Sequence, residues 1–138
     1  MIPGQGAVTQ VLEVAPGYYE ITFRPRELPE AVPGQFLQVS VSDGCDPLLR
    51  RPLSIFDLLE QEGLCKLLFK VSGRGTKLLS RFSEDSRLDY IGPLGNGFSI
   101  YPHSPRELLV AGGIGAAPLH YLARGLRQAG SEGIFLLG

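Results

Sequence analysis

The chain has 138 residues, which is enough for one ordinary domain core and little more. Its hydrophobic fraction of 43% is typical of a globular protein, and its net charge of -1 gives no reason to expect nucleic acid as a partner. No apolar run approaches the roughly eighteen residues of a membrane span, and the first residues carry no signal-peptide core. We therefore expect a cytoplasmic protein without a membrane segment.

The first two-thirds of the chain predict β structure, because short apolar and β-branched runs alternate with turn residues. The predicted strands cover residues 8–14, 18–23, 35–41, 53–58, 64–71 and 88–91. Pro33 and Gly34 predict a turn, and residues 77–82 predict one short helix. Short strands at this spacing are typical of a closed barrel or a sandwich.

The last third of the chain has a different pattern. Residues 101–106 carry two prolines and predict a linker. A short apolar run at 107–111 predicts a buried parallel strand, and a glycine-rich turn follows it. Residues 116–129 have helical periodicity, and residues 133–137 predict a second buried strand.

This strand–helix–strand order predicts the first unit of an α/β nucleotide-binding domain, which normally needs further strands. We therefore divide the chain into a β-barrel at residues 1–100 and an incomplete α/β domain at residues 101–138. Two strands alone leave an open edge and an uncovered face. Packing of the unit on the barrel or on a second copy of the chain, as in a homodimer, remains an alternative.

The segment Arg51-Pro52-Leu53-Ser54 places a cation and a hydroxyl three residues apart in a predicted strand. Alternation puts Arg51 and Leu53 on one face and Pro52 and Ser54 on the other. A planar guanidinium donates two parallel hydrogen bonds and so suits a diphosphate. A solvent-exposed arginine at a strand end is the alternative interpretation, and for a lone arginine it would be favoured.

Two glycine-rich turns add to this motif. Gly73-Arg74-Gly75-Thr76 directly precedes the predicted short helix, whose free N–H groups could bind phosphate oxygens. A plain turn capped by Thr76 is the alternative.

The second glycine-rich turn, Gly112-Gly113-Ile114-Gly115, follows a predicted strand and opens a helix, which is the context of a nucleotide-binding loop. It departs from the G-x-G-x-x-G fingerprint, because Pro118 stands where that pattern's last glycine would be sought. A tight strand–helix turn is again the alternative.

The remaining reactive residue types give no catalytic or metal-binding pattern. Cys45 and Cys65 lack the spacing of a zinc or iron–sulfur site, and Cys65 lies in an apolar strand. His103 falls in the linker, and we interpret His120 as a surface or packing residue. No paired carboxylates indicate acid–base work, so we expect no catalytic side chain and no metal ligand.

Taken in order, these motifs resemble those of the ferredoxin–NADP(+) reductase superfamily, a flavin-binding β-barrel followed by a pyridine-nucleotide domain. The Arg51–Ser54 segment is similar to the superfamily's Arg-x-Tyr-Ser/Thr signature, with Leu53 in place of the aromatic residue. The ordered set at residues 49–55, 73–80, 92–98 and 112–115 closely resembles the electron-transfer subunit of bacterial B-type dihydroorotate dehydrogenase. That resemblance covers nearly the whole chain.

The resemblance implies roles for the residues of the first motif. Arg51 would hold the diphosphate of FAD, and Ser54 would place its hydroxyl near the reactive edge of the flavin. Pro52 and Leu53 would line the isoalloxazine, with Leu53 as an apolar wall.

The resemblance also implies contacts elsewhere in the chain. Leu68, Phe69 and Lys70 would contact the outer part of FAD. Gly75 and Thr76 would bind its diphosphate. The glycine-rich loop of Gly112, Gly113, Ile114 and Gly115 would meet NADH, and residues 92–98 would form a turn near the domain junction.

The resemblance further implies an electron path from NADH through FAD and a [2Fe-2S] cluster to the FMN of a partner dihydroorotate dehydrogenase subunit, in pyrimidine biosynthesis. We expect the cluster's cysteines outside this chain, because Cys45 and Cys65 match none of them. Two alternatives stay open: the electron-transfer subunit of another NAD(P)H-linked reductase, and a non-catalytic barrel acting as a scaffold.

Overall fold

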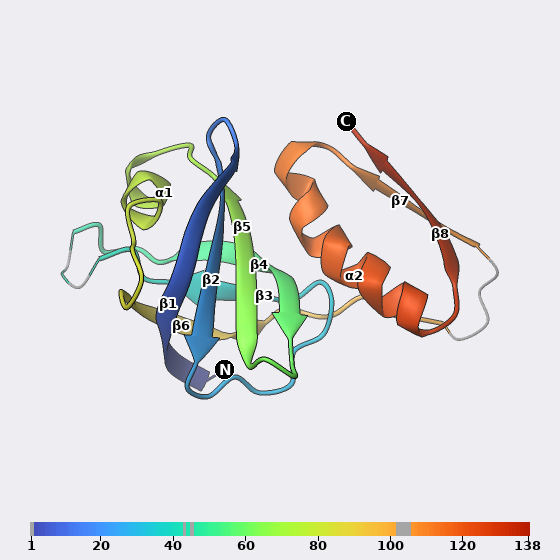
Figure 1. Ribbon diagram of the computed structural model, residues 1–138, viewed down its shortest axis with the longest axis horizontal. Helices are drawn as coiled ribbons and strands as arrows, with labels where there is room; N and C mark the ends of the chain where they lie inside the picture. Colours follow the sequence, from blue (N-terminus) through green and yellow to red (C-terminus); the bar gives the residue numbers. More distant parts are fainter. Residues whose placement is uncertain (1, 43, 45, 102–105) are drawn as a thin grey trace.

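The computed structural model describes residues 2–42, 44, 46–101 and 106–138, and it contains a β-barrel beside a smaller strand–helix–strand unit (Figure 1). The barrel strands are β1 Ile2–Ala15, β2 Tyr18–Pro25, β3 Phe36–Val39, β4 Arg51–Leu59, β5 Leu64–Lys70 and β6 Arg87–Leu94. They close in the order β1-β2-β5-β4-β3-β6, with every pair antiparallel. The prediction of an antiparallel barrel followed by one βαβ unit is confirmed.

The barrel core forms because alternate residues of each strand point inward. On β4, Leu53, Ile55 and Asp57 are buried, whereas their neighbours are half-buried or exposed. The side chains with essentially no exposed surface include Ile21, Phe23, Leu37, Val39, Ile55, Leu67, Phe69 and Leu88. This single cluster fixes the register of the strands, since a shift of one residue would turn every apolar side chain outward.

Strand β1 begins at Ile2, six residues before the predicted start at residue 8. Pro3, Gly4 and Gly6 are poor strand formers, so strand propensity did not predict this first part of β1. Glycine is needed at position 6, because a Cβ there would lie 2.7 Å from the carbonyl oxygen of Arg24. The close approach of β1 to β2 at this point helps to close the barrel.

Three other predicted boundaries were wrong by a few residues. The short helix α1 spans Arg74–Leu79 and so starts earlier than residue 77. Strand β3 is shorter than the predicted run at 35–41. Residues 92–94 continue β6 and are not part of a turn, although the following residues do leave the strand.

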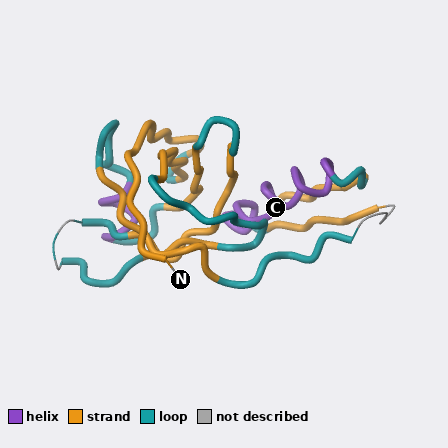
Figure 2. The backbone as a smooth tube through the Cα atoms, turned by 90° about the horizontal axis from the view of Figure 1, so that it is seen from below, coloured by secondary structure: helices purple, strands orange, loops and turns teal. Residues whose placement is uncertain are grey.

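The smaller unit consists of β7 Arg106–Ala111, the short 3₁₀ turn η1 Gly113–Gly115, α2 Ala116–Gln128 and β8 Glu132–Leu137. The two strands pair in parallel, and Figure 2 shows the helix on one side of them. A second, small core joins Leu109 of β7 to Leu122 and Leu126 of α2. The predicted linker lies largely in 102–105, outside the described residues.

The prediction that both strands of this unit are buried was wrong. Every residue of β8 is exposed, and on β7 only Leu109 and Ala111 are buried. One helix covers one face of a two-stranded sheet, so the side chains on the other face remain in solvent. A continuous apolar run is typical of a strand covered on both faces, so it predicted a second covering layer that the described residues do not supply.

Candidate functional site

Strands β4 and β5 pair along only part of their length. Their pairing runs from Ile55–Leu67 to Leu59–Leu64. Beyond it, residues 51–54 pair with β3 and residues 68–70 pair with β2, and the recorded β4–β5 register does not extend to either segment. The two strands therefore diverge, and backbone groups that would complete the ladder face an opening.

A cavity of about 500 Å³ occupies this opening. Strand β4 forms one wall, β5 forms the second, and the start of α2 with the glycine-rich loop forms the third. The lining residues are Arg51, Pro52, Leu53, Ser54, Leu68, Phe69, Lys70, Ser72, Thr76, Ile114, Gly115, Ala117 and Pro118. The three motifs singled out in the sequence thus meet in one place, although they lie far apart along the chain.

Most of the predicted site residues line this cavity, and three do not. Gly75 lies just behind Arg51, while Gly112 and Gly113 are set back from the lining. Sequence reasoning missed Ser72, Ala117 and Pro118 as lining residues. Pro118 drew notice only as a departure from the G-x-G-x-x-G fingerprint, and Ser72 and Ala117 carry no motif that could have singled them out.

Arg51 lies at the mouth of β4, against the start of α1. Its Nη1 donates a hydrogen bond to the carbonyl of Leu49 at 2.7 Å. A Cβ at position 75 would lie 2.5 Å from Nε and 2.9 Å from Cζ of Arg51, so a side chain there would displace the guanidinium. No carboxylate within the described ranges pairs with Arg51, which leaves donors of its guanidinium available to an anion.

The hydroxyl of Thr76 is engaged in its own loop. It accepts hydrogen bonds from the N–H groups of Ser72 at 3.0 Å and Gly73 at 3.3 Å, and it donates to the carbonyl of Gly73 at 3.2 Å. The helix cap is Gly73, and Thr76 is the third helical residue, so the alternative that placed Thr76 at the cap was wrong. Thr76 shapes the turn that Arg51 contacts.

The side chains of β4 and β5 face the cavity alternately. Pro52, Ser54, Leu68 and Lys70 point outward from the barrel, and Lys70 Nζ lies 5.4 Å from the centre of the Tyr18 ring.

In contrast, Leu53 is only 8% exposed and Phe69 1%, because both side chains belong to the barrel core. Leu53 lines the cavity although little of it is exposed, and the expectation that its side chain forms an apolar wall against a flavin stays a prediction.

The glycine-rich loop forms the opposite side of the cavity through Ile114 and Gly115. Gly113 has φ +52, a left-handed conformation that favours glycine, and its N–H donates to the carbonyl of Gly138 at 2.9 Å. Tyr18 of β2 lies nearby, with its hydroxyl 3.7 Å from the place of a Cβ at position 113. The loop is thus held close to the barrel wall.

A buried carboxylate that sequence reasoning missed joins α2 to the barrel. Asp57 of β4 contacts Arg124 Nη1 at 3.0 Å and His120 Nε2 at 3.6 Å. The His120 ring stacks on Phe56, with centroids 4.3 Å apart, which confirms its interpretation as a packing residue. A single aspartate within an apolar strand gives no sequence signal of such a contact.

The described cysteine has no reactive character. Cys65 is fully buried, and burial, with the nearby Asp57 carboxylate, raises the pKa of its thiol to about 12. Cys45 and His103 lie outside the described residues. The part of the chain that the structure describes has no cluster of three or more metal-ligating side chains, and none of its helices is long and apolar enough to cross a membrane.

Comparison with curated proteins identifies relatives across most of the chain. The electron transfer subunit of dihydroorotate dehydrogenase B (NAD(+)) from Bacillus caldolyticus is 41% identical over 128 residues, covering 91% of this chain and 50% of that protein. The subunit from Desulforamulus reducens is 40% identical over 132 residues, covering 95% of this chain and 50% of that protein. This chain is a homologue of these electron transfer subunits. It spans about half their length, and no family model matches it.

Solved structures agree with this relationship. The structure of an NADH-dependent reduced ferredoxin–NADP oxidoreductase matches with a TM-score of 0.83 at 31% identity, over 96% of this chain and 48% of that one. The ferredoxin reductase in carbazole 1,9a-dioxygenase matches with a TM-score of 0.82 at 19% identity, over 98% and 43%. The second match shows the fold alone. The superfamily inferred from the motifs is therefore supported by the fold as well as by sequence.

Proposed function

We propose that this homologue of the dihydroorotate dehydrogenase B electron transfer subunit binds FAD in the cavity between β4 and β5. In this proposal it passes electrons from NADH to a partner dehydrogenase. The observation that carries the proposal is the meeting of Arg51, Ser54 and the glycine-rich loop around one cavity. The barrel at residues 1–100 would hold the flavin, and residues 101–138 would begin the nicotinamide-binding domain.

The residues around the cavity fit a flavin dinucleotide. A volume of about 500 Å³ lies within the usual range of ligand sites, and its walls combine apolar side chains with a few polar groups. Arg51 offers a fork of donors beside the start of α1, which suits a diphosphate. The diverging strands leave backbone N–H and C=O groups for the polar edge of an isoalloxazine ring.

In this proposal, each wall has a separate task. Arg51, lying over Gly75, binds the diphosphate. Ser54 holds its hydroxyl near the reactive edge of the ring, and the backbones of Leu53 and Phe69 donate and accept along its polar edge. FAD, when bound, supplies the hydride-accepting chemistry, and the protein supplies placement and exclusion of water.

The remaining lining residues complete the proposed site. Pro52 packs against the ring from the β4 side. Leu68 and Lys70 of β5 contact the outer part of the cofactor. Thr76 keeps the turn beside Arg51 in shape through the hydrogen bonds of its hydroxyl.

The glycine-rich loop is the proposed contact for NADH. Gly112, Gly113, Ile114 and Gly115 lie between a parallel strand and the first turn of α2, a position where a loop can meet a phosphate. The N–H groups of Gly113 and Gly115 donate to the carbonyls of Gly138 and Gly112, so the contact would be made by the other N–H groups at this turn. Ile114 and Gly115 face β4 across the cavity, so a nicotinamide held there would be presented to the same space as the flavin.

The acceptor is proposed from the relatives. Their name places them beside a dihydroorotate dehydrogenase, which makes an FMN-containing catalytic subunit of pyrimidine biosynthesis the first candidate partner in the cytoplasm. A [2Fe-2S] cluster on the path to it would lie outside the described residues.

A second candidate partner is a ferredoxin, because the solved structure at 31% identity is named an NADH-dependent reduced ferredoxin–NADP oxidoreductase. Steady-state assays of the NADH-reduced protein with each acceptor separate these two candidates.

The FAD site is tested by the affinity of an Arg51→Ala variant for FAD. Loss of a charge-assisted contact costs about 1.5–3 kcal/mol, so we expect the affinity to fall about 10-fold or more by calorimetric titration. Arg24→Ala is the matched control, because Arg24 also donates one Nη1 hydrogen bond to a backbone carbonyl, that of Glu62 at 2.8 Å. Equal FAD affinity in both variants would overturn the assignment of Arg51.

A further inference from the structure

Helix α2 is fastened to the barrel by side chains along one of its faces. The Asp57 carboxylate on β4 contacts Arg124 Nη1 at 3.0 Å and His120 Nε2 at 3.6 Å. Arg124 Nη2 also donates to the carbonyl of Leu58 at 2.5 Å. A buried ion pair of this kind holds α2 at one position against β4, because separating the two side chains would leave a buried charge without a partner.

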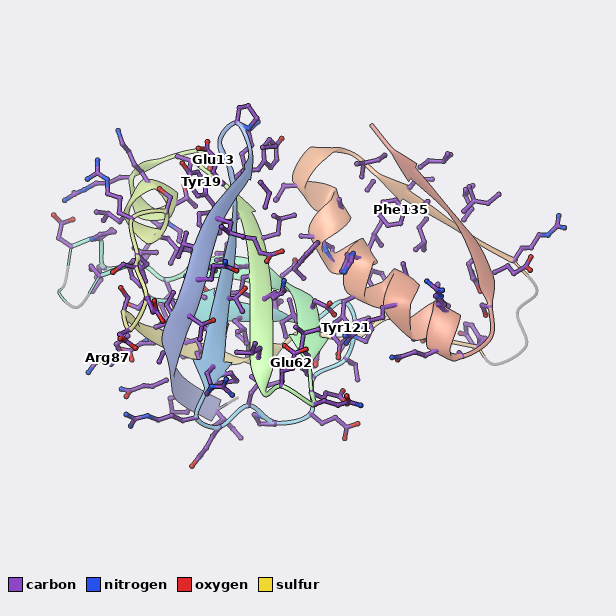
Figure 3. The ribbon with its side chains drawn as sticks, viewed as in Figure 1. Glu13, Tyr19, Glu62, Arg87, Tyr121 and Phe135 are labelled. Atoms are coloured by element: carbon purple, nitrogen blue, oxygen red, sulfur yellow. The ribbon has the colours of Figure 1, made fainter. Side chains whose placement is uncertain are left out.

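We call the contacts of Asp57 with Arg124 and His120 the seam, and two further contacts extend it. The His120 ring stacks on Phe56, and the hydroxyl of Tyr121 donates to the carbonyl of Ala31 at 2.9 Å. Figure 3 shows Tyr121 between α2 and the barrel. Residues 120, 121 and 124 lie within about one turn of the helix, so they fix one point of α2 against β4 and the loop before β3.

The same two elements form the cavity. Residues 51–54 of β4 line one wall, and Ala117 and Pro118 at the start of α2 line the opposite wall. Asp57 follows Ser54 by three residues along β4, and His120 follows Pro118 by two along α2. A helix of 13 residues is stiff, so its attachment at 120–124 also sets where its first turn and the preceding glycine-rich loop lie.

We propose that Asp57 is a positioning residue that sets the distance between the flavin wall and the nicotinamide loop. It touches neither proposed ligand and acts through Arg124 and His120. The part concerning NADH rests on the proposed function, whereas the part concerning the orientation of α2 stands on the contacts themselves. Loss of the Asp57 charge would leave the barrel core intact and release the helix.

The barrel offers a closely matched control pair. Glu20 and Lys66 form an ion pair at 2.8 Å with side chains 13% and 27% exposed, against 11% and 29% for Asp57 and Arg124. That pair joins β2 to β5 and does not reach α2. Asp57→Asn and Glu20→Gln therefore each remove one carboxylate charge of similar burial, but only the first acts on the seam.

The test compares these two variants with the wild-type chain by residual dipolar couplings in solution. In the wild-type chain and in Glu20→Gln we expect one common alignment for the barrel and α2. In Asp57→Asn we expect the couplings of α2 to shrink or to fit a separate alignment. Arg124→Lys, which keeps the charge and loses the planar fork, should change the couplings in the same direction even if Asp57→Asn folds poorly.

Kinetics of the FAD-loaded chain supply the second measurement. Asp57→Asn should raise the KM for NADH at least about 5-fold, with FAD affinity within about 2-fold of the wild-type chain. A common alignment and an unchanged KM in both seam variants would overturn the inference. If the wild-type chain binds no FAD, the proposed function fails, and the couplings alone still decide whether Asp57 orients α2.

Discussion

At the scale of single residues, the contact between Arg51 and Gly75 is the most specific feature of the cavity. The guanidinium occupies the space that a side chain at position 75 would need. An arginine held in this way is pre-arranged for an anion, because less conformational freedom is lost when the anion binds.

This contact predicts the effect of a Gly75→Ala substitution. The added Cβ should push the guanidinium away and lower FAD affinity about 5-fold or more, with little change in the melting temperature. Gly73→Ala is the control, since position 73 has extended backbone and nothing within 4 Å of a Cβ. Fluorescence titration of FAD measures both variants, and a Gly75→Ala affinity equal to that of Gly73→Ala would argue against the role of Arg51.

The sequence predicted the cavity residues well where a motif carried them. Arg51, Ser54 and Gly115 could be found because each belongs to a short pattern with a physical purpose. The resemblance assigned Leu53 and Phe69 to the ligand, whereas alternation along the strands places them in the core, and the structure follows the alternation.

Asp57 could not be predicted for a related reason. Its partners lie more than sixty residues away in sequence, on a helix whose contact with the barrel no local pattern indicates. The same holds for Tyr121, whose hydrogen bond to Ala31 joins two segments that are distant along the chain.

At the scale of secondary-structure elements, closure of the barrel depends on glycine in β1. Gly6 and Ala7 of β1 pair with both β2 and β6, and Gly4 pairs with β6, so backbones come close together here. A Cβ at Gly4 would lie 2.5 Å from the ring of Tyr90, and a Cβ at Gly6 would meet the ring of Phe23 at 2.6 Å. These glycines therefore serve packing, even though they lower the strand propensity of the segment.

Substitution of Gly6 by alanine should destabilise the chain. Overpacking against a backbone carbonyl and a buried ring costs about 1–3 kcal/mol, which urea unfolding can resolve. Gly133→Ala in the exposed strand β8 is the control, because its nearest neighbour would lie at an ordinary 3.7 Å. Equal unfolding free energies in the two variants would show that β1 closes the barrel more loosely than the structure indicates.

Most strands could be predicted, but several of their ends could not. Apolar alternation identified the six barrel strands, since one face of each is buried. β1 and α1 both start earlier than predicted, and both starts contain glycines. Glycine has low strand and helix propensity, so these residues were predicted to lie outside the elements. Their actual conformation is set by partners across the barrel and by the Arg51 contact.

At the scale of the whole molecule, two cores of unequal size meet along α2. The barrel core is large and continuous, whereas the second core is a small cluster between β7 and α2. The cavity lies where the two parts meet, and a nucleotide-binding site between two such parts is a common arrangement.

The exposed apolar side chains of the smaller unit, among them Leu108, Val110, Ile134 and Leu136, form an uncovered sheet face. Sequence patterns predicted the strands but not their exposure, which depends on what lies beside them.

The most direct measurement is an anaerobic visible spectrum of the chain after incubation with FAD and gel filtration, recorded before and after addition of NADH. We predict that the flavin band co-elutes with the protein and bleaches when NADH is added. A folded chain that emerges without flavin would contradict binding in the cavity between β4 and β5. A retained flavin band that NADH leaves unchanged would contradict the role of the glycine-rich loop.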